Sequence, residues 1–133
     1  DDYAHNPAKC AASIKACQHV AEKVVAWFQP HGYAPTRFLR HDFVKEIADA
    51  LRPQDEIWMS EIFYAGGTTI KDISANDLIQ DIKKTGKQAF FVENRNNFLA
   101  SVRPHLAAGN VLLLMGARDP SLEQFSEQIW QQL

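Results

Sequence analysis

Four short apolar segments, separated by stretches with helical periodicity, constrain the fold of this chain more than any other feature. They are Lys23–Gln29, Glu56–Phe63, Gln88–Val92 and Val111–Met115. Apolar strands that alternate with amphipathic helices are typical of a parallel sheet covered on both faces. Because crossovers in such a sheet are right-handed, the sequence predicts an α/β fold: a Rossmann-like three-layer domain with a mostly parallel sheet flanked by helices.

The expected helices carry apolar residues at three- and four-residue intervals, which places those residues on one face. Their ranges are Ala8–Glu22, Arg37–Arg52, Ser74–Lys84, Asn96–Ala108 and Ser121–Gln132. Asn6-Pro7 supplies an N-cap and a proline at the first position of the first helix. Pro104 lies inside the fourth range, where its ring and missing N–H are expected to kink the helix.

Length and charge narrow the possible functions. With 133 residues, 46% of them hydrophobic, the chain is long enough for one domain (1–133) with its own core. Its 14 Lys and Arg against 16 Asp and Glu give a net charge of −2, so the basic surface that binds nucleic-acid phosphates is not expected. No apolar run approaches the roughly 20 residues of a membrane span. We therefore expect neither nucleic acid nor a membrane as a partner.

The two cysteines, Cys10 and Cys17, lie on one face of the first expected helix. Their rise of about 10 Å exceeds the ~7 Å limit for a disulfide, which predicts buried free thiols. Free thiols fit a reducing cytoplasm, and a redox or metal role for the pair is the alternative. The histidines lack the spacing of metal ligands, and His19, His41 and His105 are expected at the surface.

Ligands of parallel α/β sheets bind beyond the carboxyl ends of the strands. Polar residues and glycines gather in the segments expected at that edge. These segments are Pro30–Thr36, Tyr64–Lys71, Gly116–Pro120 and, if a strand precedes the chain, Asp1–Asn6. This edge is the predicted binding site.

The first segment of the chain, DDYAHNP, precedes a helix N-terminus, whose free N–H groups suit a phosphate or a carboxylate. In a site, His5 would be a polar contact or proton-transfer group, and Asp2 would accept a hydrogen bond from a hydroxyl. The alternative is structural, with Asn6 serving only as a helix cap.

His31 and Arg37 lie between the first strand and the helix that follows it. Arg37 can bind a carboxylate through two parallel hydrogen bonds, although an ordinary loop with a solvated arginine is the alternative. Gly116 follows the most apolar strand, where a phosphate or ribose could approach the backbone. Neither a Walker A sequence nor G-x-G-x-x-G is present. The residues alone thus indicate a ligand-binding α/β domain related to nucleotide binding.

The same segments resemble the C-terminal domain of the Mur ligases, over essentially the whole chain. DDYAHNP is similar to the D-D-Y-[GA]-H-[HN]-P segment that opens this domain, and FQPHGYAPTR is similar to F-Q-P-H-R-[YF]-x-R-T-R. Tyr64-Ala65-Gly66, Ile73-Ser74 and Leu114–Ala117 fall at matching distances. Two long motifs at the right spacing make this resemblance specific.

The resemblance implies the chemistry of a larger enzyme. Mur ligases use ATP and Mg²⁺ to convert the carboxylate of UDP-N-acetylmuramate or its derivatives into an acyl phosphate, which the amino group of an amino acid or peptide attacks. The most similar members add L-alanine or the recycled tripeptide L-Ala-γ-D-Glu-meso-diaminopimelate. In this family the UDP-sugar and ATP-binding domains lie upstream. The chain, which starts at Asp1 without a Met, is therefore expected to be the amino-acceptor-binding domain of a longer cytoplasmic protein and inactive alone.

The resemblance also implies roles for single residues. Asp2 would bind the ATP ribose, Gly116 would lie at the nucleotide, and closure of the domain would exclude water from the acyl phosphate. The substrate-binding residues expected are Tyr3, His5, Asn6, His31, Arg37 and Arg118. No catalytic residue and no metal ligand is expected within the chain.

Two positions depart from the family pattern. The L-alanine ligases carry arginines where this chain has Gly32 and Pro35. Without these guanidinium groups, a small amino acid would lose the clamp on its carboxylate. We hypothesise that the acceptor is larger than free L-alanine or is bound differently, with Arg37 or Arg118 supplying the missing charge. A non-catalytic small-molecule or nucleotide-binding module is the alternative to a ligase domain.

Overall fold

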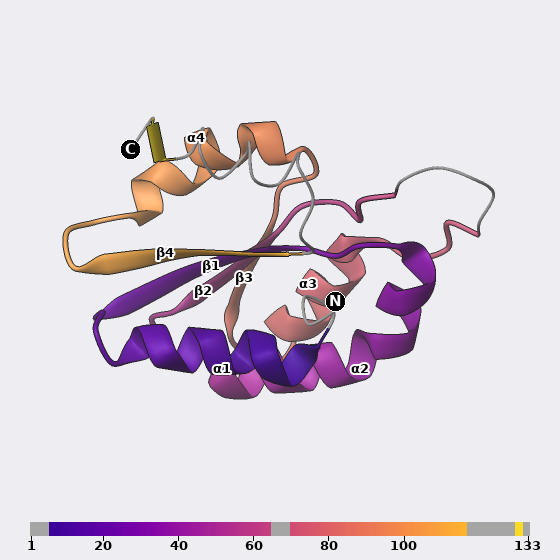
Figure 1. Cartoon of the computed structure of the whole chain (residues 1–133), viewed down its shortest axis with the longest axis horizontal. Helices are drawn as coiled ribbons and strands as arrows, with labels where there is room; N and C mark the ends of the chain where they lie inside the picture. Colours follow the sequence, from indigo (N-terminus) through magenta and orange to yellow (C-terminus); the bar gives the residue numbers. More distant parts are fainter. Residues whose placement is uncertain (1–5, 65–69, 117–129, 132–133) are drawn as a thin grey trace.

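The chain folds around one sheet that helices cover on both faces (Figure 1). The computed structural model describes residues 6–64, 70–116 and 130–131. The 4-stranded sheet has the order β3-β2-β1-β4, and neighbouring strands run parallel. The strands are β1 (Lys23–Gln29), β2 (Glu56–Met59), β3 (Gln88–Phe91) and β4 (Asn110–Gly116). The predicted Rossmann-like α/β fold is confirmed.

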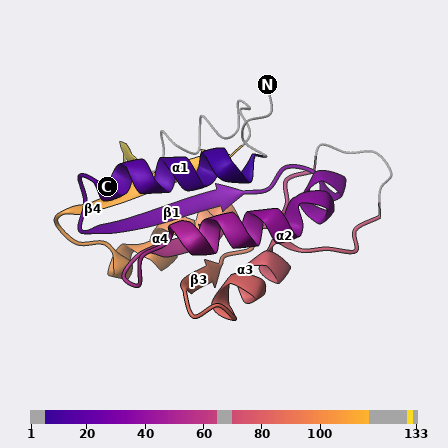
Figure 2. The same ribbon diagram turned by 90° about the horizontal axis from the view of Figure 1, so that it is seen from below.

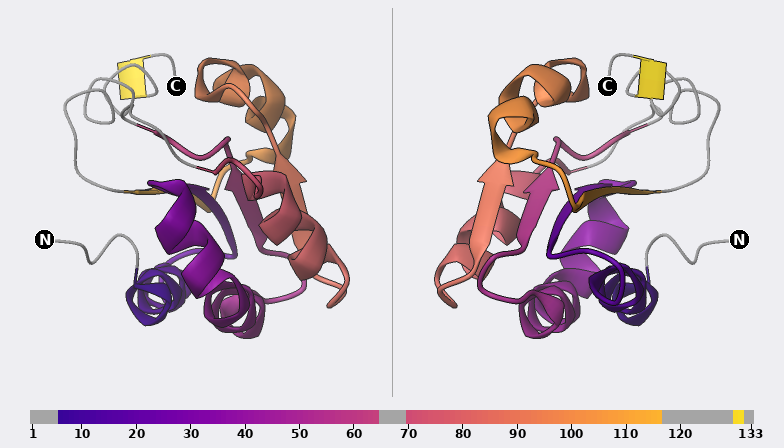
Figure 3. Two further views of the ribbon diagram at one scale, coloured as in Figure 1. Left: turned by 90° about the vertical axis from the view of Figure 1, so that its right-hand side faces the viewer. Right: turned by 90° about the vertical axis from the view of Figure 1, so that its left-hand side faces the viewer.

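Longer helices cover one face of the sheet, and a short helix covers the other (Figure 3). The first face carries α1 (Pro7–Gln18), α2 (Tyr33–Ala50) and α3 (Ala75–Lys83). The second face carries α4 (Phe98–Val102), which lies between the 3-10 turns η2 (Arg95–Asn97) and η3 (Arg103–His105). Figure 2 shows α1 and α2 running side by side along the sheet.

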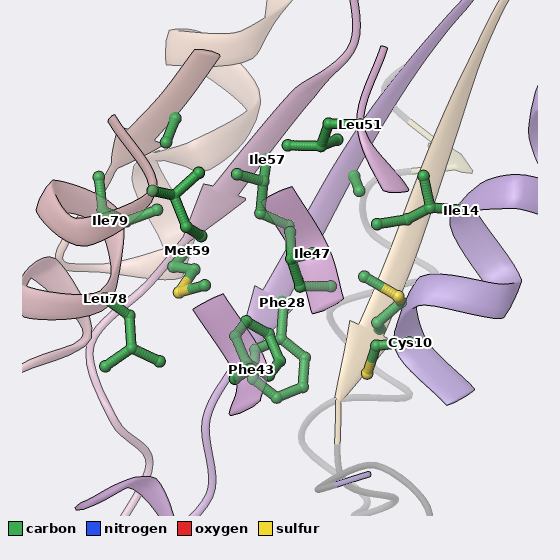
Figure 4. Packing of buried hydrophobic residues seen from close by; sticks show 14 of the residues in the cluster. Cys10, Ile14, Phe28, Phe43, Ile47, Leu51, Ile57, Met59, Leu78 and Ile79 are labelled. Atoms are coloured by element: carbon green, nitrogen blue, oxygen red, sulfur yellow. The ribbon is translucent and has the colours of Figure 1, made fainter. Parts of the chain in front are cut away.

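Alternate side chains of β1 enter two separate hydrophobic cores. The first core, between the sheet and α1–α3, is drawn in Figure 4, and its Phe28 and Phe43 rings lie 4.7 Å apart between centroids. In the second core, under α4, the Trp27 and Phe98 centroids lie 5.9 Å apart. Because both faces of β1 are buried, successive residues of this strand must be apolar, which explains its unbroken apolar run.

Two helices begin at the caps that the sequence offers. The Oδ1 atom of Asn6 accepts hydrogen bonds from the N–H groups of Ala8 (2.9 Å) and Lys9 (3.2 Å), and Pro7 opens α1. At α3, Ser74 and Asp77 form a capping box. Both starts satisfy N–H groups that the first helical turn cannot pair internally.

The range Asn96–Ala108 does not form the single kinked helix that its periodicity predicts. Instead, α4 ends at Val102, and Pro104 lies in the 3-10 turn η3. Proline has no N–H to donate to the carbonyl four residues earlier, and its ring crowds that carbonyl. The helix therefore tightens into a 3-10 turn, and this part of the sequence prediction was wrong.

Two other strand and helix boundaries differ from the sequence prediction. β2 ends at Met59 rather than at Phe63, and Phe63 instead forms an isolated parallel bridge with His31. α2 begins at Tyr33, inside the segment expected to be a loop. The helix predicted over Ser121–Gln132 lies outside the described residues except for 130–131.

The strand order creates a topological switch point between β1 and β4. α2 and α3, which follow β1 and β2, lie on one face, whereas α4, which follows β3, lies on the other. At the carboxyl end of these two strands, Gln29 pairs in register with Gly116. Open parallel sheets bind ligands at such a point. Within the described part of the chain, no helix has the length and apolar character needed to cross a bilayer.

Candidate functional site

The segment after β1 is fixed to the segment after β2 by reciprocal backbone hydrogen bonds. The N–H of Phe63 donates to the carbonyl of Pro30, and the N–H of Gly32 donates to the carbonyl of Phe63, both at 2.8 Å. Between them, the His31 ring stacks on the Phe63 ring, with centroids 4.6 Å apart and planes within 2°. His31 is thus positioned at the carboxyl edge of the sheet, where the sequence predicts it.

Gly32 and Pro35, the two positions that depart from the Mur ligase pattern, lie at the start of α2, where Gly32 is the N-cap residue. Gly32 has φ +87°, a left-handed conformation that favours glycine. A Cβ atom at this position would lie 3.2 Å from Cδ of Pro35. Thr36 completes the turn, because its hydroxyl donates to the carbonyl of Gly32 at 2.6 Å. The backbone here is therefore adapted to the residues present and would strain any side chain at position 32.

Arg37 lies one helical turn further along α2 and forms an ion pair within the chain. Its guanidinium donates to Oδ1 of Asp72 at 2.7 Å and to the carbonyl of Ile70 at 2.9 Å. The Arg37 side chain is 35% exposed and that of Asp72 55% exposed, so solvent screens the pair. A substrate carboxylate at Arg37 would have to share the guanidinium with Asp72.

Glu61 closes the base of the segment that leads from β2 to α3. Its Oε1 accepts from the hydroxyl of Ser74 at 2.6 Å, and its Oε2 accepts from the N–H groups of Ile62 and Ala75, both at 2.9 Å. The carboxylate is thereby placed at the N-terminus of α3, the positive end of the helix dipole. Residues at the two ends of this segment are joined by one side chain.

A polar hollow opens at the same edge, beyond β1, β2 and β3. It is lined by Gln29, Glu61, Ile62, Phe63, Tyr64, Glu93, Asn94, Arg95 and Asn96. Gln29 connects its parts, since it accepts from the guanidinium of Arg95 at 2.9 Å and donates to the carbonyl of Glu61 at 2.9 Å. The edge is thus a continuous polar surface built from three strand ends.

Among the remaining predicted site residues, the structure describes Asn6 and Gly116. Asn6 caps α1, whose N-terminus lies at the carboxyl end of the strands because α1 runs opposite to β1 (Figure 2). Gly116 lies at the end of β4 beside Gln29. The positions of Asp2, Tyr3, His5 and Arg118 lie outside the described residues.

At the opposite, amino edge of the sheet, Glu56 is a buried carboxylate with several donors. Lys23 Nζ lies 2.9 Å from Oε2 of Glu56, the indole N–H of Trp58 donates to Oε1 at 2.8 Å, and Nδ1 of His105 lies 3.0 Å from Oε2. Burial acts to raise the pKa of Glu56, but the contacts with Lys23, Trp58 and His105 outweigh it and lower this pKa below its ordinary value.

The surface interpretation of His105 was therefore wrong. Only 32% of its side chain is exposed, and its ring lies edge-on to that of Trp58 with centroids 5.0 Å apart. The partner Glu56 is 49 residues away in sequence, so no local pattern indicates the pair. His19 and His41 are exposed, as predicted.

Asp55 is a second buried carboxylate, and it ties the end of α2 to β1. It accepts from the N–H of Val24 at 2.8 Å, from the amide of Gln18 at 2.8 Å, and from the guanidinium of Arg52 at 3.0 and 3.1 Å. Burial acts to raise the pKa of Asp55, yet these hydrogen bonds lower it overall. This cluster stabilises the fold and lies away from the candidate site.

Cys10 and Cys17 are not joined by a disulfide, as predicted. Burial raises the pKa of Cys10 to about 11, so the reactive thiolate is scarce at neutral pH. Cys17 is only partly buried, and burial raises its pKa as well. Among residues 6–64, 70–116 and 130–131, no three His, Cys, Asp or Glu side chains come together as metal ligands.

A family model described as "Mur ligase, glutamate ligase domain" matches residues 1–118 of the chain. The chain belongs to the Mur ligase family. The UDP-N-acetylmuramate–L-alanine ligase of Nitrosomonas eutropha is 34% identical over 120 residues, which are 88% of this chain and 24% of that protein. The corresponding ligase of Lachnospira eligens is 33% identical over 120 residues, 90% of this chain and 25% of that protein.

A solved structure supports the same membership. The UDP-N-acetylmuramate-alanine ligase of Thermotoga maritima matches all of this chain with a TM-score of 0.63 and 26% identity, over 26% of its own length. This Mur ligase domain thus spans about a quarter of the length of the relatives that it matches.

Within this Mur ligase domain, sequence reasoning missed Glu61 and Asp72. Glu61 joins residues 13 and 14 positions further on, and Asp72 pairs with a residue 35 positions earlier. The signal for Glu61 was its place three residues before Tyr64-Ala65-Gly66, which resembles the family pattern. Asp72 had no such signal, because ion pairs between separate loops depend on the fold.

Proposed function

We propose that this chain is the amino-acceptor-binding domain of an ATP-dependent muramyl ligase. The observation that carries the proposal is the joined pair of loops at the carboxyl edge: Pro30 and Gly32, in the segment that resembles the family's second motif, are hydrogen-bonded to Phe63, which follows β2. Such a rigid edge can orient an acceptor amine toward an activated carboxylate. The names of the relatives supply the substrate class.

In this proposal, UDP-N-acetylmuramate is activated by ATP as an acyl phosphate, the acceptor's amino group attacks the acyl carbon, and inorganic phosphate leaves. The chain contributes acceptor contacts from Tyr3, His5, Asn6, His31, Arg37 and Arg118, and nucleotide contacts from Asp2 and Gly116. The UDP-sugar, ATP and Mg²⁺ sites would belong mainly to upstream domains of the same cytoplasmic polypeptide. The domain alone would then be inactive.

Two acceptors are open, L-alanine and L-Ala-γ-D-Glu-meso-diaminopimelate. The φ of +87° at Gly32 supports the longer or differently bound acceptor, because an arginine at this position would be strained. Murein recycling would then be the pathway served.

The test is phosphate release by the full-length protein with ATP, Mg²⁺ and UDP-N-acetylmuramate, with each acceptor offered separately. Turnover with L-alanine would place the enzyme at the first peptide-forming step and would overturn the inference from Gly32. Turnover with the tripeptide alone would support a recycling ligase. No turnover with either acceptor would contradict the ligase proposal and favour a non-catalytic binding module.

A further inference from the structure

We propose that Glu61 is a positioning residue for the acceptor site. The inference rests on the proposed function and deepens it: Glu61 would act by fixing the loop whose residues contact His31 and Arg37, rather than by binding the acceptor itself. Nothing in the family resemblance above assigns this residue a role. Its contacts connect it, through the loop between β2 and α3, to the acceptor-binding segment after β1.

The Glu61 carboxylate binds both ends of the segment between β2 and α3. On one side, Oε2 accepts from the N–H of the adjacent Ile62. On the other, Oε1 and Oε2 accept from Ser74 and Ala75, the N-cap and first residue of α3. Hydrogen bonds to an ionised acceptor are about twice as strong as neutral ones, so one side chain closes the loop at its base.

The described parts of this loop contact the acceptor-binding segment after β1. Phe63 bonds to the backbone of Pro30 and Gly32 and stacks on His31. Near the other end of the loop, Asp72 and Ile70 bind the guanidinium of Arg37. Both contacts lie inside the span that Glu61 closes.

The backbone of Glu61 also connects it to the ends of the neighbouring strands. The backbone carbonyl of Glu61 accepts from Gln29, the last residue of β1, while its N–H donates to the carbonyl of Glu93 beyond β3. Glu61 therefore joins three strand ends through its backbone and one helix start through its side chain. Removing the carboxylate would loosen residues 62–64 and 70–74 without removing these backbone bonds.

Steady-state kinetics of the full-length ligase test this role, with Glu61→Ala and Glu61→Gln compared with wild type. Glu61→Ala is expected to raise the KM for the acceptor about tenfold, while kcat and the KM for ATP stay within about twofold. Glu61→Gln can keep its oxygen on Ile62 and Ala75 and donate its amide to Ser74. It should therefore recover most of the acceptor KM.

Asp77→Ala is the matched control. Asp77 accepts from the N–H of Ser74 at 2.9 Å, so its loss weakens the same helix N-terminus but leaves the carboxylate of Glu61 in place. We expect Asp77→Ala to lower Tm while the acceptor KM stays within about twofold of wild type. An equal rise in KM for Asp77→Ala, or an unchanged KM for Glu61→Ala, would overturn the positioning role.

Amide hydrogen exchange at residues 62–64 and 70–74 separates failure of this inference from failure of the proposed function. In Glu61→Ala, faster exchange at both stretches is expected, with exchange in β1 unchanged; Asp77→Ala should not affect residues 62–64. Unchanged exchange in Glu61→Ala would overturn the inference even in an active ligase. A wild-type enzyme without turnover would overturn the ligase function, whatever the exchange result.

Discussion

Gly32 and Pro35, the two residues that depart from the family pattern, lie close to each other in sequence at the start of α2. The φ of +87° at Gly32 is accessible to glycine, and the position of its missing Cβ is crowded by the Pro35 ring. The sequence showed that arginines were missing from these two positions, but it did not show that a Cβ atom at position 32 would meet the Pro35 ring. An arginine restored at position 32 would be strained by this positive φ and crowded by Pro35.

Gly32→Ala should lower the free energy of unfolding by about 1–3 kcal/mol, because alanine is strained at positive φ and its Cβ meets Pro35. Denaturant unfolding measures this loss. Gly86→Ala is the matched control, since Gly86 has φ +92° and no atom lies within 4 Å of the place that an added Cβ would occupy. The crowding explanation fails if both variants lose the same stability.

Arg37→Ala tests whether this guanidinium binds the acceptor in the full-length ligase. If it does, the acceptor KM should rise by about 10- to 100-fold, the equivalent of one hydrogen-bonded charge contact. Arg40→Ala is the control on the same helix, because Arg40 pairs with Asp81. An acceptor KM that is unchanged in Arg37→Ala would assign Arg37 only to the ion pair with Asp72.

At the scale of elements, local chemistry decided where α1 and α3 start, whereas α2, which has no side-chain cap, begins four residues before its predicted start at Arg37. Asn6 and Ser74 both act as N-caps, and both lie directly before the helix that they open. The end of α4 depended on Pro104, whose effect was a change of helix type rather than the expected kink. β2 ends at Met59, and Phe63 forms only an isolated bridge with His31, a pairing between residues that no local pattern connects.

Substitutions at Asn6 measure what the α1 cap contributes. Asn6→Ala should lower the free energy of unfolding by about 1 kcal/mol, because two N–H groups lose their acceptor. Asn6→Asp keeps an oxygen there and adds a charge that suits the helix dipole, so its stability should match or exceed that of wild type. Equal stability of Asn6→Ala and wild type in thermal unfolding would refute the cap's contribution.

At the scale of the whole molecule, the amino edge of the sheet carries buried carboxylates that stabilise the fold, whereas the carboxyl edge carries the candidate site. Glu56 and Asp55 lie at the amino ends of the strands, where each binds donors from distant segments. The carboxyl ends carry the polar hollow and the joined loops. The two edges can therefore change independently, one for stability and the other for ligand binding.

The lowered pKa of Glu56 predicts an acid-dependent stability. A carboxyl group that ionises more readily in the folded state stabilises that state above its unfolded pKa of about 4.5 and loses the contribution as pH falls through the folded pKa. Unfolding free energies measured from neutral pH into acid should decline more steeply below this value in wild type than in Glu56→Gln.

Glu56→Gln should also be less stable at neutral pH, because Lys23 would lose its charged partner. Glu22→Gln, at an exposed position, is the control and should follow the wild-type profile. Parallel profiles for wild type and Glu56→Gln across the acid range would exclude this carboxylate as the origin of the effect.

The sequence by itself determined the sheet, the alternation of strands and helices and the edge at which ligands should bind, because these follow from local periodicity and from the handedness of crossovers. It also carried the family motifs that place His31 and Arg37 at that edge. Only the tertiary structure decided the partners of Glu61, Arg37 and His105. The contacts of Glu61 with Ser74 and Ala75, of Arg37 with Asp72 and of His105 with Glu56 join residues 13 to 49 positions apart, so they depend on packing rather than on a local pattern.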